Sequence, residues 1–194
     1  MYFIKHTENS KFALSKLLLD IHIIDKTFRP FISEEKLMNR ISGLADEIRD
    51  FYGNECVCFV SVLNGAFMFS SDLLKRMKGD VEISFVKLSS YSGTKSRGQV
   101  DELIGLSDDI KNKHIVILED IVDTGITIEK VMLLLQNKLP KSIQVCTLLY
   151  KPEAYTGELP PKFVGFEIEN KFVVGYGLDY NELGRNISSI YQLK

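Results

Sequence analysis

Residues 115–127 read Ile115-Val116-Ile117-Leu118-Glu119-Asp120-Ile121-Val122-Asp123-Thr124-Gly125-Ile126-Thr127. The apolar run from Ile115 to Leu118 predicts a buried strand, and apolar residues at helical spacing predict a helix from Thr127 to Leu135. Gly125 allows the backbone to turn sharply between the two elements. If the strand belongs to a parallel sheet, its acidic end lies at the carboxyl edge, where α/β proteins bind their ligands.

The segments around this stretch also alternate between strands and helices. Ser33 predicts a helix N-cap, with Glu34 and Glu35 in the first turn, and Gly53 predicts the end of that helix. A second helix is predicted over 66–77. Further strands are predicted over 57–62, 81–88, 143–149, 163–168 and 172–174. This order predicts an α/β fold, formed by a single domain over residues 1–194 in which helices flank a mainly parallel central sheet.

The composition is that of an ordinary globular protein. Hydrophobic residues make up 45% of the chain and charged residues 26%, and the net charge of −2 without a basic run argues against a nucleic-acid partner. No basic leader begins the sequence and no segment approaches the ~20 apolar residues of a membrane span, so we expect a cytoplasmic protein. The cysteines form no CxxC pair, and we expect Cys56 and Cys58 to share one face of a strand in the core.

The turn from Asp123 to Thr127 carries groups that bind a phosphate. Backbone N–H groups at a helix N-terminus and the hydroxyls of Thr124 and Thr127 can converge on one anion. The G-x-x-x-x-G-K-[ST] pattern of nucleoside-triphosphate P-loops is absent, and Gly175 and Gly177 lack the third glycine of a dinucleotide fingerprint. The sequence also has no H-E-x-x-H zinc motif and no G-x-S-x-G nucleophile motif.

Three carboxylates lie next to this predicted phosphate site. Glu119, Asp120 and Asp123 would repel a phosphate unless they faced sugar hydroxyls, a divalent cation or a proton to be removed. Helix capping or solvation could account for each acid singly, but not for a cluster of three between an apolar strand and a glycine turn. The arrangement is typical of a ribose 5-phosphate site.

The segment from Leu118 to Thr127 resembles the phosphoribosyl pyrophosphate signature of type I phosphoribosyltransferases. Further matches, in family order over most of the chain, point to the hypoxanthine-guanine branch: Leu63-Asn64-Gly65, Ser90-Tyr91, Lys151, Phe172-Val173-Val174-Gly175-Tyr176-Gly177-Leu178-Asp179-Tyr180-Asn181-Glu182 and Arg185. The resemblance implies the type I fold with a small base-binding hood and a flexible lid. It also implies purine salvage, in which hypoxanthine or guanine and phosphoribosyl pyrophosphate give IMP or GMP and pyrophosphate.

The resemblance implies roles for the residues around the phosphate turn. The 5-phosphate would be bound by Asp123, Thr124, Gly125, Ile126 and Thr127, and the ribose hydroxyls by Glu119 and Asp120, in part through Mg²⁺. Asp123 would also be the general base near N7 of the purine. Pyrophosphate would be bound by Leu63, Asn64, Gly65 and Arg185, and in the family the peptide bond between Leu63 and Asn64 is often cis.

The residues implied for purine binding are Lys151, Phe172, Val173 and Asp179. Lys151 would donate a hydrogen bond to O6, and because an ammonium only donates, it would reject the 6-amino group of adenine. Phe172 would stack on the base, Val173 would contact its edge through the backbone, and Asp179 would hold a second Mg²⁺ on pyrophosphate. Taken singly, Lys151 could equally be a solvated lysine, Phe172 a core aromatic and Asp179 a surface acid.

Residues 89–98 form a polar stretch without apolar periodicity, which predicts a long loop. By the resemblance this loop is the lid, with Ser90 and Tyr91, and it would keep water from an oxocarbenium-like transition state. The N-terminal stretch through Phe31 carries no recognisable motif.

Two positions depart from some family members, which have a lysine in place of Asn64 and in place of Ile126. Two other functions are open: a xanthine-preferring phosphoribosyltransferase, and a regulator that senses a phosphoribosyl ligand without catalysis. Lys151, Asp179 and Arg185 argue against the regulator, because a sensor needs no pyrophosphate machinery. The family implies a homodimer or homotetramer.

Overall fold

The computed structural model describes residues 19–88, 102–104 and 110–194, and within them the predicted α/β fold is confirmed. The larger sheet has the strand order β5-β4-β3-β6-β7-β8. Strands β4, β3, β6, β7 and β8 are parallel, and β5 pairs antiparallel with β4. The bounds are Val57–Leu63 for β3, Glu82–Leu88 for β4, Glu102–Ile104 for β5, His114–Val122 for β6, Ser142–Tyr150 for β7 and Phe163–Glu167 for β8.

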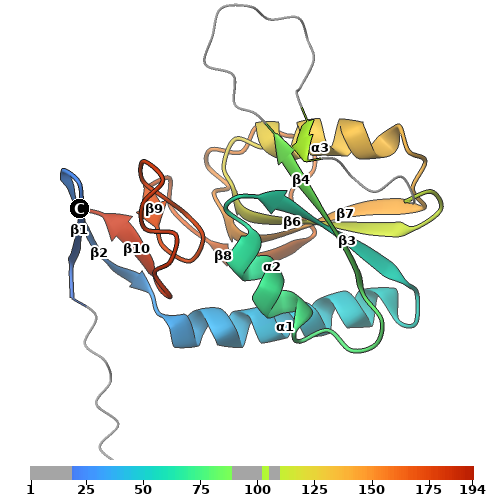
Figure 1. Ribbon diagram of the computed structural model, residues 1–194, viewed down its shortest axis with the longest axis horizontal. Coiled ribbons are helices and arrows are strands. Elements are labelled where there is room, and N and C mark those ends of the chain that lie inside the picture. The colour runs from blue at the N-terminus through green and yellow to red at the C-terminus, as the bar shows by residue number, and fades with distance from the viewer. Residues whose placement is uncertain (1–18, 89–101, 105–109) are drawn as a thin grey trace, which may run out of the picture.

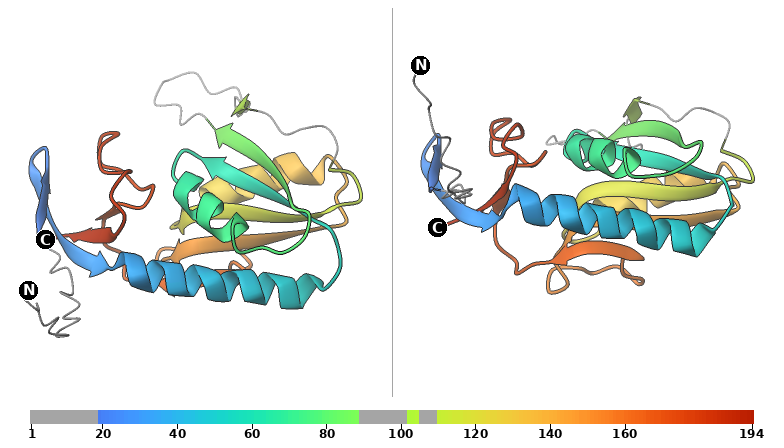
Figure 2. Two further views of the ribbon diagram at one scale, coloured as in Figure 1. Left: turned by 60° about the horizontal axis from the view of Figure 1, so that its bottom comes forward. Right: turned by 90° about the horizontal axis from the view of Figure 1, so that it is seen from below.

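Helices cover both faces of this sheet (Figures 1 and 2). The helices α1 (Glu34–Tyr52) and α2 (Phe67–Leu74) lie on one face, and α3 (Ile126–Gln136) lies on the other. The caps of α1 are those predicted. The Ser33 hydroxyl accepts a hydrogen bond from the Lys36 N–H at 3.4 Å, and Gly53 ends the helix with φ of 59°.

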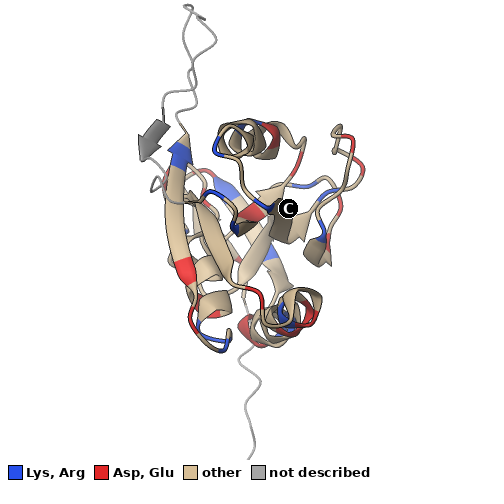
Figure 3. Ribbon diagram, turned by 90° about the vertical axis from the view of Figure 1, so that its right-hand side faces the viewer, with Lys and Arg blue, Asp and Glu red and all other residues tan. Residues whose placement is uncertain are grey.

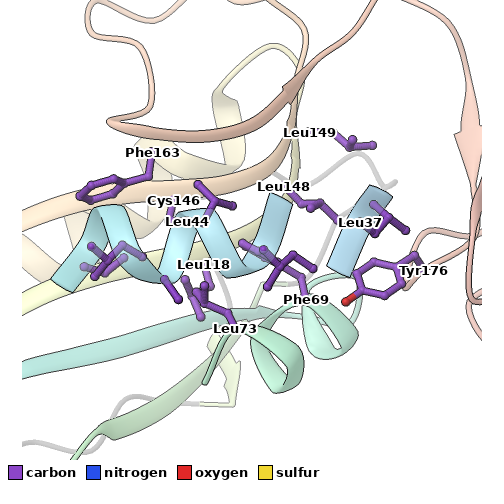
Figure 4. Close-up of a cluster of buried hydrophobic side chains, with 14 of the residues drawn as sticks. Leu37, Leu44, Phe69, Leu73, Leu118, Cys146, Leu148, Leu149, Phe163 and Tyr176 are labelled. Carbon is purple, nitrogen blue, oxygen red and sulfur yellow. The ribbon is translucent and has the colours of Figure 1, made fainter. Parts of the chain in front are cut away.

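The alternation of side chains along β6 builds two cores. Val116 and Leu118 belong to the core under α1 and α2, whereas Ile115 and Ile117 belong to the core under α3. Figure 4 shows the first core, where leucines of α1 and α2 meet the central strands. Both faces of β6 are therefore buried, which explains why the strand is apolar without alternation.

A smaller sheet stands at one end of the molecule, beside the start of α1 (Figure 1). Its strand order is β1-β2-β10-β9, and all neighbours are antiparallel. The bounds are Ile21–Ile23 for β1, Lys26–Ile32 for β2, Val173–Val174 for β9 and Ile190–Leu193 for β10. We call residues 19–32 and 172–194 together the hood. The N-terminal stretch, which carries no motif, thus supplies two of the four hood strands.

Several sequence-based predictions differ from the structure in detail. Cys56 is exposed because β3 begins at Val57, so only Cys58 of that pair lies in the core. At the end of α1, Tyr52 is buried, whereas Phe51 is half-exposed. Strand β6 continues to Val122, so Glu119 and Asp120 lie inside the strand rather than after it.

Two further predictions concern helix bounds and the lid. Helix α2 ends at Leu74, three residues before the predicted Met77, and α3 begins at Ile126 instead of Thr127. The proposed lid residues Ser90 and Tyr91 lie outside the described residues.

Lys and Arg are interspersed with Asp and Glu along the ribbon, in keeping with the absence of a basic run in the sequence (Figure 3). Among the described residues, no helix is both long and apolar enough to cross a membrane.

Candidate active site

The predicted phosphate turn connects β6 to α3 at the carboxyl edge of the sheet. Gly125 is the N-cap of α3, with φ of 91°, a conformation that glycine adopts without strain. A cavity of about 230 Å³ lies over the turn. It is lined by Glu119, Ile121, Val122, Asp123, Thr124, Gly125, Ile126, Thr127 and Ile128. The five residues predicted to bind the 5-phosphate thus share one cavity with Glu119 at a helix N-terminus, where anions are favoured.

The loop after β7 supports the phosphate turn from behind. The carbonyl of Thr124 accepts hydrogen bonds from the N–H and the hydroxyl of Thr156, at 3.2 and 3.0 Å. The ring of Tyr155 lies against Gly125, and a Cβ added to Gly125 would be 2.6 Å from its Cε2 atom. A side chain at Gly125 would therefore both strain the backbone and displace Tyr155. Neither Tyr155 nor Thr156 carries a sequence signal that would have identified it.

Glu119 and Asp120 are buried carboxyl groups, with exposed fractions of 7% and 8%. Burial raises the pKa of Glu119 well above its usual range, and the neighbouring Asp120 carboxylate raises it further. Burial also raises the pKa of Asp120. The Oε2 atom of Glu119 has no hydrogen-bond partner among the described residues. The unpartnered oxygen of Glu119 can accept a cation or a donor group from a ligand.

Removing the charge of Glu119 is expected to stabilise the metal-free protein. Because the pKa values of Glu119 and Asp120 are raised on folding, stability falls as the pH rises above about 4. Glu119→Gln stays neutral, so its Tm in EDTA at about pH 8 should exceed that of the unmodified protein, by about 2–4 °C per kcal/mol gained. The difference should vanish as the pH falls below about 4. The exposed control Glu169→Gln should give no gain, and a Glu119→Gln gain that grows with acid would contradict this explanation.

Asp123 and Lys151 form an ion pair at the same edge of the sheet. Val122 of β6 is in register with Tyr150 of β7, so the residues that follow the two strands are neighbours. The Lys151 ammonium donates to Asp123 Oδ2 at 2.8 Å. Lys151 is only 6% exposed, whereas the Asp123 side chain is 43% exposed. The structure therefore brings the predicted general base and the predicted O6 donor together.

The loop after β3 meets both Asp120 and the hood. The peptide bond between Leu63 and Asn64 is cis, as the resemblance implied. A Cβ added to Gly65 would lie 1.7 Å from Asp120 Oδ2. A Cβ added to Gly177 would lie 2.0 Å from the carbonyl oxygen of Gly65. Only glycines allow the β3 loop, the acidic end of β6 and the hood turn to approach this closely.

Arg185 contacts two other residues of the hood, Gly177 and Asp179. Its guanidinium donates to the Gly177 carbonyl at 2.9 Å and pairs with Asp179 Oδ1 at 2.7 Å. The other oxygen of Asp179 accepts the N–H of Glu182 at 2.8 Å. Both Asp179 oxygens thus have partners within the chain, and in the described residues no three His, Cys, Asp or Glu side chains gather as a metal site. The metal role of Asp179 stays a prediction.

The predicted stacking residue Phe172 lies in an aromatic cluster of the hood. Its ring is 6.3 Å from that of Phe28 and 5.9 Å from that of Tyr180, and the Lys26 ammonium lies 5.8 Å from its centre. Phe172 is 43% exposed, so a face or edge of the ring is free of protein. Val173, the next residue, is buried and pairs with β10. Phe28 and Lys26 come from the N-terminal stretch that the sequence did not connect with this site.

Comparisons with known proteins bear on the family and the fold of this chain. Residues 33–181 match the family described as the phosphoribosyl transferase domain. A hypoxanthine-guanine phosphoribosyltransferase of Staphylococcus aureus (strain Mu50 / ATCC 700699) is 41% identical over 165 residues, 84% of this chain and 92% of that protein. A hypoxanthine phosphoribosyltransferase of Haemophilus influenzae is 42% identical over 163 residues, 82% and 91% of the two chains. The crystal structure of a hypoxanthine-guanine phosphoribosyltransferase from Bacillus anthracis, with HEPES in its active site, has a TM-score of 0.80 at 36% identity and covers 86% of this chain and 98% of that one.

Proposed function

This chain belongs to the phosphoribosyltransferase family, and from that membership we propose that it is a purine-salvage enzyme. It transfers the phosphoribosyl group of phosphoribosyl pyrophosphate to hypoxanthine or guanine, with IMP or GMP and pyrophosphate as products. The relatives named above carry this activity in their names. In a soluble enzyme of this kind we expect a cytoplasmic location and a homodimer or homotetramer.

One observation carries the choice of substrate: the pair of Asp123 and Lys151 beside the phosphate cavity. N7 and O6 lie on the same edge of a 6-oxopurine. A carboxylate and an ammonium 2.8 Å apart match that edge, because Asp123 accepts from the N7–H while Lys151 donates to O6. In adenine the same edge presents an amino group, which would face the Lys151 ammonium and leave both donors unsatisfied.

The residues divide the reaction between them. The amides and hydroxyls of residues 123–127 hold the 5-phosphate, and Glu119 and Asp120 face the ribose. N9 of the purine attacks the anomeric carbon, the bond to the pyrophosphate oxygen breaks, and the N7 proton passes to Asp123. The residues of the β3 loop and Arg185 hold the departing pyrophosphate. Phe172 and Val173 of the hood position the base.

Mg²⁺ fits the donor set of this site. A buried pair of carboxyls with an unpartnered oxygen at Glu119 is suited to a hard cation, which usually retains water and substrate oxygens as further ligands. When bound, Mg²⁺ would offset the charge of the pyrophosphate group. Glu119 and Asp120 would hold it, and Asp179 would hold a second ion after release from Arg185.

A direct assay tests the proposal. The purified protein is incubated with Mg²⁺, phosphoribosyl pyrophosphate and one of hypoxanthine, guanine, xanthine or adenine, and nucleotide formation is measured. We expect product from hypoxanthine and guanine only. Product mainly from xanthine would favour the xanthine-preferring alternative, and binding of phosphoribosyl pyrophosphate without product from any purine would favour the sensor.

Restoring a cation to the phosphate turn should tighten substrate binding. Ile126, half-exposed at the start of α3, has a lysine in some family members. Ile126→Lys is expected to lower the KM for phosphoribosyl pyrophosphate about fivefold, since a partly exposed charge pair contributes on the order of 1 kcal/mol. Leu133→Lys adds the same charge on the exposed side of α3 and should leave this KM unchanged. Equal effects of the two variants would mean that net charge alone is responsible.

A further inference from the structure

A buried tyrosine of the hood contacts a helix of the core. Tyr176 is 1% exposed, and its hydroxyl donates to Asp72 Oδ2 of α2 at 2.6 Å. In Figure 4 the ring lies at the edge of the core under α1 and α2, close to Phe69 of α2, and its oxygen points toward α2. A buried tyrosine hydroxyl needs a partner, and here the partner belongs to the other part of the molecule.

Both ends of this hydrogen bond are held firmly. On the hood side, the N–H of Tyr176 donates to the Ile187 carbonyl at 2.7 Å, and the N–H of Gly177 donates to the Arg185 carbonyl at 2.9 Å. On the core side, Asp72 pairs with Lys75 at 3.1 Å, and its carbonyl accepts from Arg76 at 2.7 Å. The hood segment around Tyr176 and helix α2 can therefore move little relative to each other at this contact.

The two ends lead to opposite halves of the proposed site. Tyr176 follows Phe172 and Val173, which face the purine, and precedes Asp179. Asp72 lies on α2, which starts directly after the pyrophosphate loop of Asn64 and Gly65. The hydrogen bond thus joins the hood segment that is proposed to position the purine to helix α2, which follows the loop that is proposed to hold pyrophosphate.

We propose that the hydrogen bond between Tyr176 and Asp72 sets the distance between the purine half and the pyrophosphate half of the active site. The two side chains are then positioning residues, which touch neither substrate. The inference rests on the proposed function, because it assumes that the two halves must align for transfer. Misplacement of reacting groups by about 1 Å can cost about a hundredfold in rate, and α2 is joined to the hood at this point.

Variants at the two ends separate positioning from mere stability. Tyr176→Phe and Asp72→Ala each remove the bond, whereas Asp72→Asn keeps an acceptor oxygen for the hydroxyl. We expect kcat to fall about tenfold or more in the first two and to stay within about threefold in Asp72→Asn. The double variant Tyr176→Phe/Asp72→Ala should be no slower than either single variant. The Kd for phosphoribosyl pyrophosphate alone should change less than about twofold in all of them.

A second link between hood and core provides the control. The Ser189 hydroxyl accepts from the Glu34 N–H at 3.1 Å, at the start of α1 and away from the pyrophosphate loop. Ser189→Ala should lower Tm but leave kcat within about twofold. Tm is measured for every variant, and if Tyr176→Phe does not fold, the comparison of Asp72→Ala with Asp72→Asn decides the question alone.

The proposal is overturned if Tyr176→Phe or Asp72→Ala keeps the unmodified kcat, if Asp72→Asn is as slow as Asp72→Ala, or if Ser189→Ala is equally slow. A rise in Kd that accounts for the whole loss would also overturn it. Failure of the unmodified protein to form nucleotide from any purine would instead refute the proposed function.

Discussion

Replacing Asp123 with Asn is expected to lower kcat with hypoxanthine by about a hundredfold or more. A positioned general base contributes about 10²–10⁴ to the rate, and an amide of the same shape cannot take the N7 proton. The variant keeps an acceptor oxygen for Lys151, so the 2.8 Å contact between the two side chains need not be lost. The measurement is kcat with hypoxanthine at saturating concentrations of both substrates.

Two further measurements are needed to interpret the Asp123→Asn variant. The Kd for IMP and the Tm should stay close to those of the unmodified protein, because the Asp123 side chain is half-exposed and the phosphate contact proposed for residue 123 comes from its backbone. Asp46→Asn removes the same charge from the exposed face of α1 and should leave kcat unaltered. An unchanged kcat in Asp123→Asn would remove Asp123 from the role of general base.

Replacing Lys151 with Gln is expected to lower kcat/KM for hypoxanthine by about tenfold to a hundredfold and to weaken the rejection of adenine. A hydrogen bond from a charged donor is worth roughly 1.5–3 kcal/mol, and Lys151 is buried next to Asp123. The Gln side chain still donates to O6, but its carbonyl can also accept from a 6-amino group. The measurement is the ratio of kcat/KM for hypoxanthine to that for adenine.

Lys171→Gln is the matched control, since Lys171 is exposed and pairs with Glu169, two residues away. It should leave both the rate and the ratio unchanged. A ratio that stays constant in Lys151→Gln, with a lower rate for both purines, would show that Lys151 supports the site without selecting the base.

The phosphate turn and its acids could be predicted from the sequence because they are local. A buried strand, three acids, a glycine and a helix start occur within residues 115–127, and the structure has these features in that region, although β6 extends to Val122 and includes Glu119 and Asp120. The contact between Asp123 and Lys151 follows from one long-range fact, that β6 and β7 are parallel neighbours in register. The sequence predicts a parallel sheet, in which such a contact is possible. It does not predict which strands are neighbours in that sheet.

The hood could not be predicted in the same way. Strand β2 pairs with β10, although the two strands lie near opposite ends of the sequence. The residue pattern of neither strand indicates with which strand it pairs. The contacts of Gly65 with Asp120 and of Gly177 with Gly65 depend on how the hood docks on the sheet. The hydrogen bond from Tyr176 to Asp72 has the same origin, because its two residues are far apart in the sequence. Cys56 is exposed because it lies just before Val57, the first residue of β3.

A crystal structure of the protein with IMP bound would test the central claim most directly. We predict the 5-phosphate against the backbone of residues 123–127, the ribose hydroxyls toward Glu119 and Asp120, and O6 of the base within hydrogen-bond distance of Lys151. A nucleotide bound at another place, with the turn at Gly125 free of phosphate, would contradict the account.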